Sequence, residues 1–458
     1  MVQGHLTPAQ ALACGWRVAP SVSSAWAATQ GAYRFLHNPR ISLPTLVKPL
    51  LEVAQTAVPA ACDRYVLAVH DWSLLRYRRH HSKADRLKLK GKAWAEGYEL
   101  HSCLLVGDRA GNPLAPVSLS LHTSEGAHCT RSRQVRSILS VLDEIDPVMT
   151  FVEKQSLAKP VVHILDAEAD SVAHYRLWSE QAQRYYLVRA DDRLVEFNGV
   201  EQKCSAVRQS LRKQGGFRYS REVVYHRKPA QQYVCEASIR LLRAGQQNRA
   251  DGSRARVTGP PLTLRLVISE VRSLQGEVLA TWYLLTNVPA DVETSTIALW
   301  YYWRWRIETF YKLLKSAGMN LEQWQQESAA ALVRRLLVAC MACVVVWQLA
   351  RDATPEAAET RDMLIRLSGR LMERANVSRN QRCWLDCGCC CKSKKRSRCT
   401  TWKPYNVSPL SPCPTPAPAL KVLARLCRKE WAGRQWHPIR SPQSAIRNFF
   451  ARRSPWPS

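Results

Sequence analysis

Tyr65-Val66-Leu67-Ala68-Val69-His70-Asp71 and Pro160-Val161-Val162-His163-Ile164-Leu165-Asp166 are two short apolar runs, and each of them ends in an aspartate. Runs of this length, rich in β-branched residues, are typical of buried strands. Further strands are predicted at 98–106, 114–122 and 185–189, and helices at about 133–157 and 171–183. Strands and helices mixed in this way predict an α/β fold, with a mixed sheet flanked by helices.

The chain on either side of this unit has different periodicities. Apolar residues alternate with a period of two at 217–226, 233–241, 262–271 and 279–286, which predicts an inserted β subdomain over 191–290. Within it, the stretch 243–261 is rich in Gly, Arg and Asn and is expected to form an exposed loop. Helical periodicity occupies 24–60 at the N-terminal side, and 294–317 and 327–351 beyond the subdomain.

Composition excludes some classes of protein and favours others. With 458 residues, of which 46% are hydrophobic, the chain can bury a large core, so a disordered or fibrous protein is excluded. The formal net charge of +29 predicts a polyanionic partner, most often nucleic acid. The last 78 residues contribute strongly, because 381–458 holds 16 basic and two acidic residues.

The positions of the cysteines and the lengths of the apolar runs indicate the cellular compartment of the protein. Eight of the 16 cysteines lie between Cys383 and Cys427 and the others are scattered singly, which is no secreted disulfide framework. The first 13 residues show no signal peptide. The longest apolar run, Leu336 to Trp347, has 12 residues, too few to span a bilayer. We therefore expect an intracellular, cytoplasmic protein without a membrane partner.

Asp71 and Asp166 each follow a predicted strand of the same sheet. Ligand-binding side chains emerge at strand ends in α/β folds. Taken singly, however, a strand-terminal aspartate is more often a turn or helix-cap residue.

A third acidic residue lies in the predicted helix that begins near residue 294. The segment Tyr301-Tyr302-Trp303-Arg304-Trp305-Arg306-Ile307-Glu308 continues to Lys315. At about 100° per residue, Tyr301, Arg304, Glu308 and Lys315 share an arc of about 60°. The simple alternative is a solvated face on which Arg304 and Glu308 form an ordinary i,i+4 pair, worth roughly 0.2–0.5 kcal/mol. The aromatic residues around these positions instead favour a helix packed on most sides.

Two-metal phosphoryl transfer would explain why such residues converge. Carboxylates hold two Mg²⁺ ions about 4 Å apart, one beside the attacking oxygen and one beside the leaving oxygen. Neighbouring Arg and Lys side chains then hold the nonbridging phosphate oxygens. Asp71, Asp166 and Glu308 are of the residue types that this chemistry needs.

The chain resembles the DDE transposases of bacterial insertion sequences, in the branch whose signature is Tyr, two residues, Arg, three residues, Glu, six residues, Lys. Tyr301, Arg304, Glu308 and Lys315 match this spacing without a gap. Other segments that look like the family are His70-Asp71-Trp72-Ser73, Leu165-Asp166-Ala167-Glu168-Ala169-Asp170 and Gly31-Ala32-Tyr33-Arg34-Phe35-Leu36. The similarity runs from about residue 27 to about residue 352.

The resemblance implies a ribonuclease H-like catalytic domain with a β insertion between the second Asp and the Glu. It implies that Asp71, Asp166 and Glu308 are the catalytic residues and hold two Mg²⁺ ions, which Mn²⁺ could replace. Glu168 and Asp170 are expected to orient their loop. The candidate DNA contacts are Tyr301, Arg304, Lys315, Trp282, Arg189, Arg306, Tyr33, Arg34 and Arg40. For Trp282 the alternatives are stacking on a flipped base or packing as a core strand residue, and for Arg189 a phosphate contact or a structural ion pair.

The two ends of the chain depart from the family pattern. The segment 1–22 lacks a basic helical lead-in, which suggests a missing or altered start. In the tail, Cys387, Cys389, Cys390 and Cys391 crowd five positions. A zinc site and a basic nucleic-acid-binding tail are two interpretations. We favour a third, a frameshift near residue 380, because synonymous codons read one register earlier can spell an amphipathic helix for this region.

These observations predict five segments and one leading function. The segments are an N-terminal helical DNA-binding segment (1–60), the catalytic core in two parts (61–190 and 291–380), the β subdomain (191–290) and a basic Cys/Pro-rich tail (381–458). For the tail, a frameshifted and disordered segment is the favoured interpretation. The leading function is an Mg²⁺-dependent transposase that binds inverted-repeat ends, cuts them and joins them to target DNA. It would act as a homodimer if the C-terminus is competent, in the bacterial cytoplasm at the nucleoid. The alternatives are an inactive remnant that only binds DNA, and a ribonuclease H-like nuclease.

Overall fold

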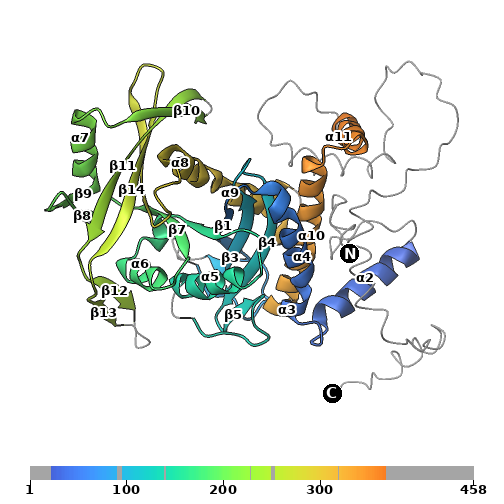
Figure 1. Cartoon of the computed structure of the whole chain (residues 1–458). Coiled ribbons are helices and arrows are strands. Elements are labelled where there is room, and N and C mark those ends of the chain that lie inside the picture. The colour runs from blue at the N-terminus through green and yellow to red at the C-terminus, as the bar shows by residue number, and fades with distance from the viewer. Residues whose placement is uncertain are drawn as a thin grey trace. The chain divides into compact units, whose positions relative to one another are not determined.

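A mixed β-sheet with helices packed against it forms the protein (Figure 1). The structure is a computed structural model and describes residues 22–89, 95–138, 141–226, 228–248, 253–317 and 319–367. The strands at its centre are β1 (Val66–Arg76), β3 (Glu96–Gly107), β4 (Pro113–Thr123), β6 (Val161–Leu165) and β7 (Tyr185–Ala190). They lie in the order β4-β3-β1-β6-β7, with β3 and β4 antiparallel to their neighbours and β6 and β7 parallel to β1.

β1 is longer than its apolar run predicts. The expected strand ended before Asp71, whereas β1 continues to Arg76, so Asp71 lies within the strand and not beyond it. The reason is β3, which pairs with every residue of β1, from Val66 opposite Gly107 to Arg76 opposite Gly97. Gly97 permits the final pairing, since a Cβ there would lie 1.8 Å from the carbonyl oxygen of Leu75.

The region 191–290 continues the same sheet. β15 (Val278–Thr286) pairs antiparallel with β7, and β14 (Leu262–Arg272), β11 (Lys228–Leu241), β8 (Leu194–Phe197) and β9 (Val200–Lys203) follow in order. β10 (Arg218–Tyr225) pairs with β11. At the other edge, β5 (Gly126–Cys129) pairs with β4, and β2 (Leu87–Lys88) pairs with β3. The four period-two runs are therefore strands, as predicted.

Two features of this region differ from the sequence prediction. The expected loop at 243–261 contains a hairpin of β12 (Gly245–Asn248) and β13 (Arg254–Val257). Arg176 holds the base of this hairpin, because its guanidinium donates to the carbonyl oxygens of Arg243, Val257 and Pro260. A helix that was not predicted, α7 (Cys204–Lys213), follows β9. Both elements depend on contacts with distant segments.

Helices cover the sheet. The N-terminal ones are α2 (Val22–His37), α3 (Leu43–Leu46) and α4 (Lys48–Ala61), and the next are α5 (Ile145–Glu153) and α6 (Val172–Ser179). Beyond β15 come α8 (Thr294–Trp303), α9 (Trp305–Lys312), α10 (Ala329–Arg351) and α11 (Pro355–Leu367). Short 3₁₀ turns occupy Val141–Glu144, Ala167–Ala169 and Leu321–Gln323, and a π-helical turn occupies Leu313–Ala317. The expected helix over 133–157 is thus confined to its second half.

α10 is the most deeply buried helix of the described chain. It has the length and composition to cross a membrane, but its most apolar stretch is 89% buried inside the protein. It packs against β4, α2, α3 and α4, and its residues belong to the same hydrophobic core as those of β1 and β3. Its apolarity is explained by this burial. A second core lies among the helices α5, α6 and α7 and the strands β7, β8, β11, β14 and β15.

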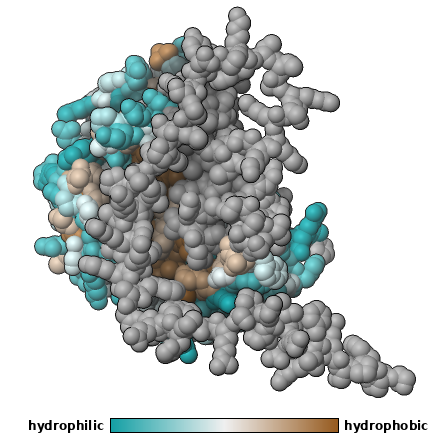
Figure 2. Space-filling view, turned by 90° about the vertical axis from the view of Figure 1, so that its right-hand side faces the viewer, coloured by the Kyte–Doolittle hydropathy of each residue, from teal (hydrophilic) through white to brown (hydrophobic). Residues whose placement is uncertain are grey.

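The described residues visible in Figure 2 are mostly hydrophilic at the margin of that face and more hydrophobic toward its centre. The predictions for 1–21 and for the tail, 381–458, concern residues outside the described ranges.

Candidate functional site

The register of two parallel strands brings Asp71 and Asp166 to equivalent positions. β1 and β6 pair as Val66 opposite Val161 through Val69 opposite Ile164, a constant offset along the chain. The same offset relates Asp71 to Asp166, which directly follows β6. Adjacent strands lie about 4.8 Å apart. Two residues 95 positions apart in the sequence are therefore neighbours across the sheet.

Asp71 is held by backbone and side-chain donors. The Trp72 amide donates to its Oδ1 at 2.8 Å, and the Arg304 guanidinium donates to its Oδ2 at 3.2 Å. The Tyr311 hydroxyl donates to the Asp71 carbonyl oxygen at 2.6 Å, which ties α9 to β1. The pKa of Asp71 is raised to about 7. Burial is the largest cause and the carboxylates of Asp166 and Glu308 add to it, whereas Arg304 and the Trp72 amide oppose it.

The sequence left open whether Asp166 is a cap residue or a site residue, and in the structure it caps a turn and also lies among the acidic residues. Its Oδ1 accepts a hydrogen bond from the Glu168 amide at 3.0 Å, so it caps the 3₁₀ turn Ala167–Ala169. Its charge also acts on Asp71, Glu308 and Arg304. The role of a cap and a position among the acidic residues are thus compatible.

Arg304 lies between α8 and α9 and joins the acidic residues. Its Nη1 contacts Asp71 and its Nη2 contacts Glu308, the latter at 2.9 Å, and the residue is only 6% exposed. Burial opposes the charge of Arg304, but Tyr301 and the carboxylates of Asp71, Asp166 and Glu308 raise its pKa. The pair with Glu308 is therefore part of a larger buried cluster and not an isolated surface pair.

Glu308 lies at the accessible side of this cluster. Its side chain is 39% exposed, compared with 15% for that of Asp71. Burial raises the pKa of Glu308, and Asp166 adds to the effect while Arg304 opposes it. The three acidic residues are therefore electrostatically coupled, and one of them faces solvent.

Tyr301, Trp282 and Arg189 lie beside the acidic residues. Tyr301 is buried, and its ring lies 6.5 Å from that of Trp282 on β15. Burial raises the pKa of Tyr301, while the guanidiniums of Arg304 and Arg189 lower it. Trp282 is partly buried and packs against the main core, and Arg189 is paired in register with Leu284 between β7 and β15. Tyr301 therefore lies beside the acidic residues, and Arg189 and Trp282 lie next to Tyr301.

Lys315 and Arg306 lie apart from the contacts that join the acidic residues. Lys315 donates to the Leu74 carbonyl oxygen at 2.5 Å and lies 3.7 Å from Glu322, so it contacts β1 beyond Asp71. It falls within the π-helical turn, where the assumed spacing of about 100° per residue no longer holds. Burial lowers the pKa of Arg306, with Tyr302 opposing.

The N-terminal candidates lie on α2 and the turn after it. Tyr33 is 58% exposed and its ring stacks on that of His37 at 4.1 Å. Arg34 and Arg40 are also exposed. Arg334 of α10 fixes this region, because it donates to the carbonyl oxygens of Leu36 and Ile41 at 2.8 and 2.9 Å.

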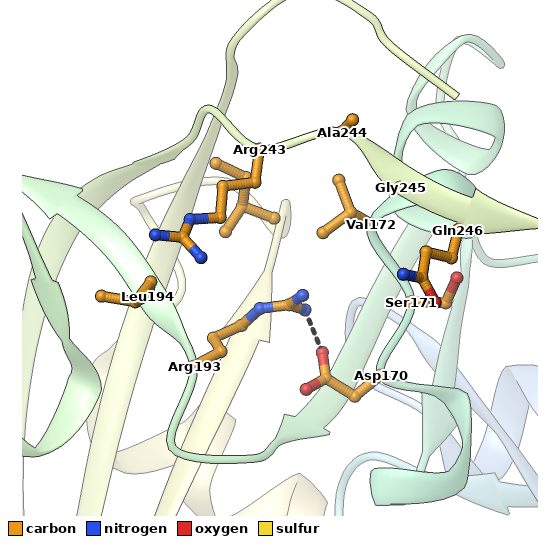
Figure 3. Close-up of a pocket in the computed structure, with 10 residues that line it drawn as sticks. Asp170, Ser171, Val172, Arg193, Leu194, Arg243, Ala244, Gly245 and Gln246 are labelled. Carbon is orange, nitrogen blue, oxygen red and sulfur yellow. Dashed lines mark hydrogen bonds and ion pairs between the residues drawn. The ribbon is translucent and has the colours of Figure 1, made fainter. Parts of the chain in front are cut away.

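Asp170 orients its loop, as predicted. It accepts hydrogen bonds from the Tyr175 hydroxyl and the Asp191 amide and forms an ion pair with Arg193 (Figure 3). Asp170 and Arg193 border a cavity of about 500 Å³ between α6, the start of β8 and the hairpin β12–β13. Asp71, Asp166 and Glu308 do not line this cavity.

The sequence did not predict a row of buried polar side chains that begins at His70, next to Asp71. His70 Nε2 lies 2.9 Å from His163 Nδ1. His163 Nε2 lies 3.2 Å from the carboxylate of Glu153, which also forms an ion pair with Arg184. Burial lowers the pKa of both histidines, which favours their neutral forms, while Glu153 opposes the effect at His163. The signal was present, since a histidine precedes Asp71 and Asp166 within each apolar run, but the pairing required the sheet register.

The acidic residues fit a divalent cation by chemical type. All the donors are carboxylate oxygens, which are the ligands of Mg²⁺ and Mn²⁺. No group of three or more His, Cys, Asp or Glu side chains within the described ranges has a metal-ligating arrangement. Arg304 provides the positive charge between Asp71 and Glu308 instead.

The fold and the site together define an α/β protein in which carboxylates from two parallel strands and a helix meet around an arginine. Residues 63–345 match the model of the family described as "Transposase DDE domain". This match covers more than half of the chain, and the chain belongs to the DDE transposase family.

One solved structure with detectable similarity is described as a cryo-EM structure of a piggyBac transposase synaptic complex with hairpin DNA. It shares 12% sequence identity, with a TM-score of 0.30, over 70% of this chain and 56% of the piggyBac chain. The match thus spans little more than half of the piggyBac transposase chain.

The raised pKa of Asp71 predicts a pH-dependent effect of Mg²⁺ on stability. Between pH 3.8 and about 7 the folded state binds more protons at Asp71 than the unfolded state does, so the free energy of unfolding falls as pH rises. A divalent cation bound to the ionised carboxylate would offset this loss of stability. We expect Mg²⁺ to raise the melting temperature more at about pH 8 than at about pH 5. Equal shifts at both pH values, or the same pH dependence in Asp71→Asn, would contradict the prediction.

Proposed function

We propose that this chain is the transposase of a bacterial insertion sequence, in the branch marked by Tyr301, Arg304, Glu308 and Lys315. It would bind inverted-repeat ends and catalyse Mg²⁺-dependent strand cleavage and strand transfer. The observation that carries the proposal is the meeting of Asp71, Asp166 and Glu308 around one buried arginine. The strand order β4-β3-β1-β6-β7 supports a ribonuclease H-like interpretation of the core.

In this proposal the acidic residues hold two Mg²⁺ ions. The ions would supply an activated oxygen nucleophile and stabilise the leaving oxygen. Asp71 and Asp166 are fixed by backbone amides, so their carboxylates are oriented before any ligand binds. Glu308 reaches the same cluster from α9, and its side chain is more exposed than that of Asp71.

Cationic and aromatic residues around the cluster would bind the DNA. Arg304 is the nearest cation. When no metal is bound, the carboxylates share its positive charge, and a phosphate of the DNA could pair with the guanidinium in their place. Arg189 and Tyr301 border the same region. Trp282, partly exposed beside Tyr301, is suited to contact a base, whereas Lys315 would contact DNA farther along β1. Tyr33, Arg34, Arg40 and Arg306 are further proposed contacts.

A strand-joining assay separates a transposase from a nuclease. The purified protein is incubated with pre-cut inverted-repeat ends carrying a free 3′-OH, a target plasmid and Mg²⁺. We expect products in which the end is covalently joined to the plasmid. A nuclease would shorten its substrate without forming such products, and a DNA-binding remnant would shift the ends in a gel without nicking them. The assay also tests the proposed homodimer, because a pair of ends joined in concert requires two active sites.

A further inference from the structure

A short segment beyond Asp71 concentrates positive charge. The segment Arg76–Lys88, here called the basic loop, contains six Lys or Arg residues and a single acidic one, Asp85. It begins at the last residue of β1 and ends at β2. None of the catalytic assignments proposed above uses these residues.

Buried side chains at intervals hold the basic loop in place. The hydroxyl of Tyr77, which is fully buried, donates to the Leu321 carbonyl oxygen at 2.6 Å. Lys83, also buried, donates to the Gln326 carbonyl oxygen. Asp85 accepts hydrogen bonds from the Tyr98 hydroxyl and the Ala329 amide. The loop is therefore a defined structure anchored to β3 and to the start of α10.

The residues between these anchors are cationic and exposed. Arg78, Arg79, His81 and Lys88 all face solvent. Neither Arg78 nor Arg79 has an ion-pair partner among the residues that the structure describes. By contrast, the anchored Arg86 pairs with Glu96 at 2.8 Å. Two adjacent uncompensated guanidiniums on a rigid loop form a surface suited to phosphate groups.

The basic loop is connected to the acidic cluster through β1. Arg76 lies five residues beyond Asp71 on the same strand, a distance of about 17 Å at about 3.3 Å per residue. The strand is fixed there by Lys315, which donates to the Leu74 carbonyl oxygen, and by Glu322, which accepts from the Arg76 amide at 3.0 Å. The spacing between cluster and loop is therefore set by the fold.

We propose that the basic loop binds backbone phosphates of the duplex whose scissile phosphate lies at Asp71, Asp166 and Glu308. This inference rests on the proposed function and adds the path of the DNA across the protein. With a rise of about 3.4 Å per nucleotide, a duplex that follows β1 presents phosphates about five to seven nucleotides from the cleavage position at Arg78 and Arg79. The contacts carry no sequence preference, because they are made to the backbone.

Phosphate neutralisation in the DNA tests this path directly. Inverted-repeat duplexes are prepared with methylphosphonates at single positions from two to ten nucleotides on either side of the cleavage site. We expect the wild-type protein to lose affinity for duplexes modified about five to seven nucleotides away on one side. The double variant Arg78→Ala, Arg79→Ala should be insensitive to these modifications, since the partners of those phosphates are absent. Equal sensitivity of both proteins at every position overturns the proposal.

The salt dependence of binding gives a second measurement with a matched control. Loss of two phosphate contacts should lower the slope of log K against log salt concentration by about 1.8, and weaken binding at about 0.1 M salt roughly tenfold or more. Arg212→Ala, Lys213→Ala on α7 removes the same charge from two exposed positions. If the control variant shows the same loss, net charge and not the basic loop is responsible, and the proposal fails.

These binding measurements are independent of catalysis. If the protein neither cuts nor joins DNA, the proposed function fails, whereas the methylphosphonate pattern still reports on the basic loop. If cleavage occurs and the double variant binds every modified duplex as the wild type does, only the loop assignment fails.

Discussion

Replacing Glu308 by glutamine should lower Mg²⁺-dependent cleavage of the inverted-repeat end by about 10³-fold or more, equivalent to about 4 kcal/mol of barrier. The amide keeps the size of the side chain and can still lie beside Arg304, but it carries no charge to bind a divalent ion. Cleavage is measured as the initial rate of nicking of a labelled end at saturating protein. The affinity for the same end, measured without metal, should change little.

Glu293→Gln is the matched control for this experiment. Glu293 precedes α8 and is exposed, and its carboxylate accepts a hydrogen bond only from the Ser295 hydroxyl among the described residues. Its substitution removes one carboxylate from the same helical region without touching the acidic cluster. A rate for Glu308→Gln within a few-fold of that for Glu293→Gln would mean that Glu308 is a surface charge and would remove the basis of the proposed function.

Replacing Glu144 by alanine should destabilise the fold by about 3–5 kcal/mol, because it leaves a buried arginine without its counter-ion. Arg131 and Glu144 form an ion pair in which the two side chains are 5% and 2% exposed. Arg131 also donates to the Ser118 hydroxyl at 2.8 Å, and Glu144 accepts from the Ser120 hydroxyl at 3.2 Å. The free energy of unfolding is obtained from urea titration followed by tryptophan fluorescence.

The double variant Arg131→Met, Glu144→Leu distinguishes the ion pair from simple packing. Apolar side chains of similar volume avoid the desolvation of both charges, so the double variant should be much more stable than Glu144→Ala. If the two variants lose the same stability, the cost arises from altered packing near β4 and not from an unpaired charge.

The acidic residues could be chosen from the sequence because each stands at a recognisable position. Asp71 and Asp166 close the two apolar runs, and Glu308 fits a spacing signature with Tyr301, Arg304 and Lys315. Their catalytic and DNA-binding roles stay predictions. Lys315 illustrates the limit of the method, because a π-helical turn displaces it from the helical face and toward Leu74.

Arg304 illustrates another limit. On a helical wheel it is one half of an i,i+4 pair with Glu308, and in the structure it also contacts Asp71, 233 residues away. Whether such a side chain is a surface charge or a buried bridge depends on what packs around it. Tyr301, Asp71 and Asp166 supply that environment, and the two aspartates are brought there by the fold and not by local periodicity.

The sequence by itself determined the type of most strands and helices, the family resemblance and the identity of the acidic residues, because these follow from local periodicity, residue chemistry and spacing. Only the tertiary structure decided how far β1 extends, that the strands of 191–290 continue the main sheet, and that a hairpin forms at Gly245–Val257. The physical reason is that each of these depends on hydrogen-bond partners and burial supplied by distant segments. The same holds for the pKa of Asp71, which is set by burial and by two carboxylates that only the fold brings near.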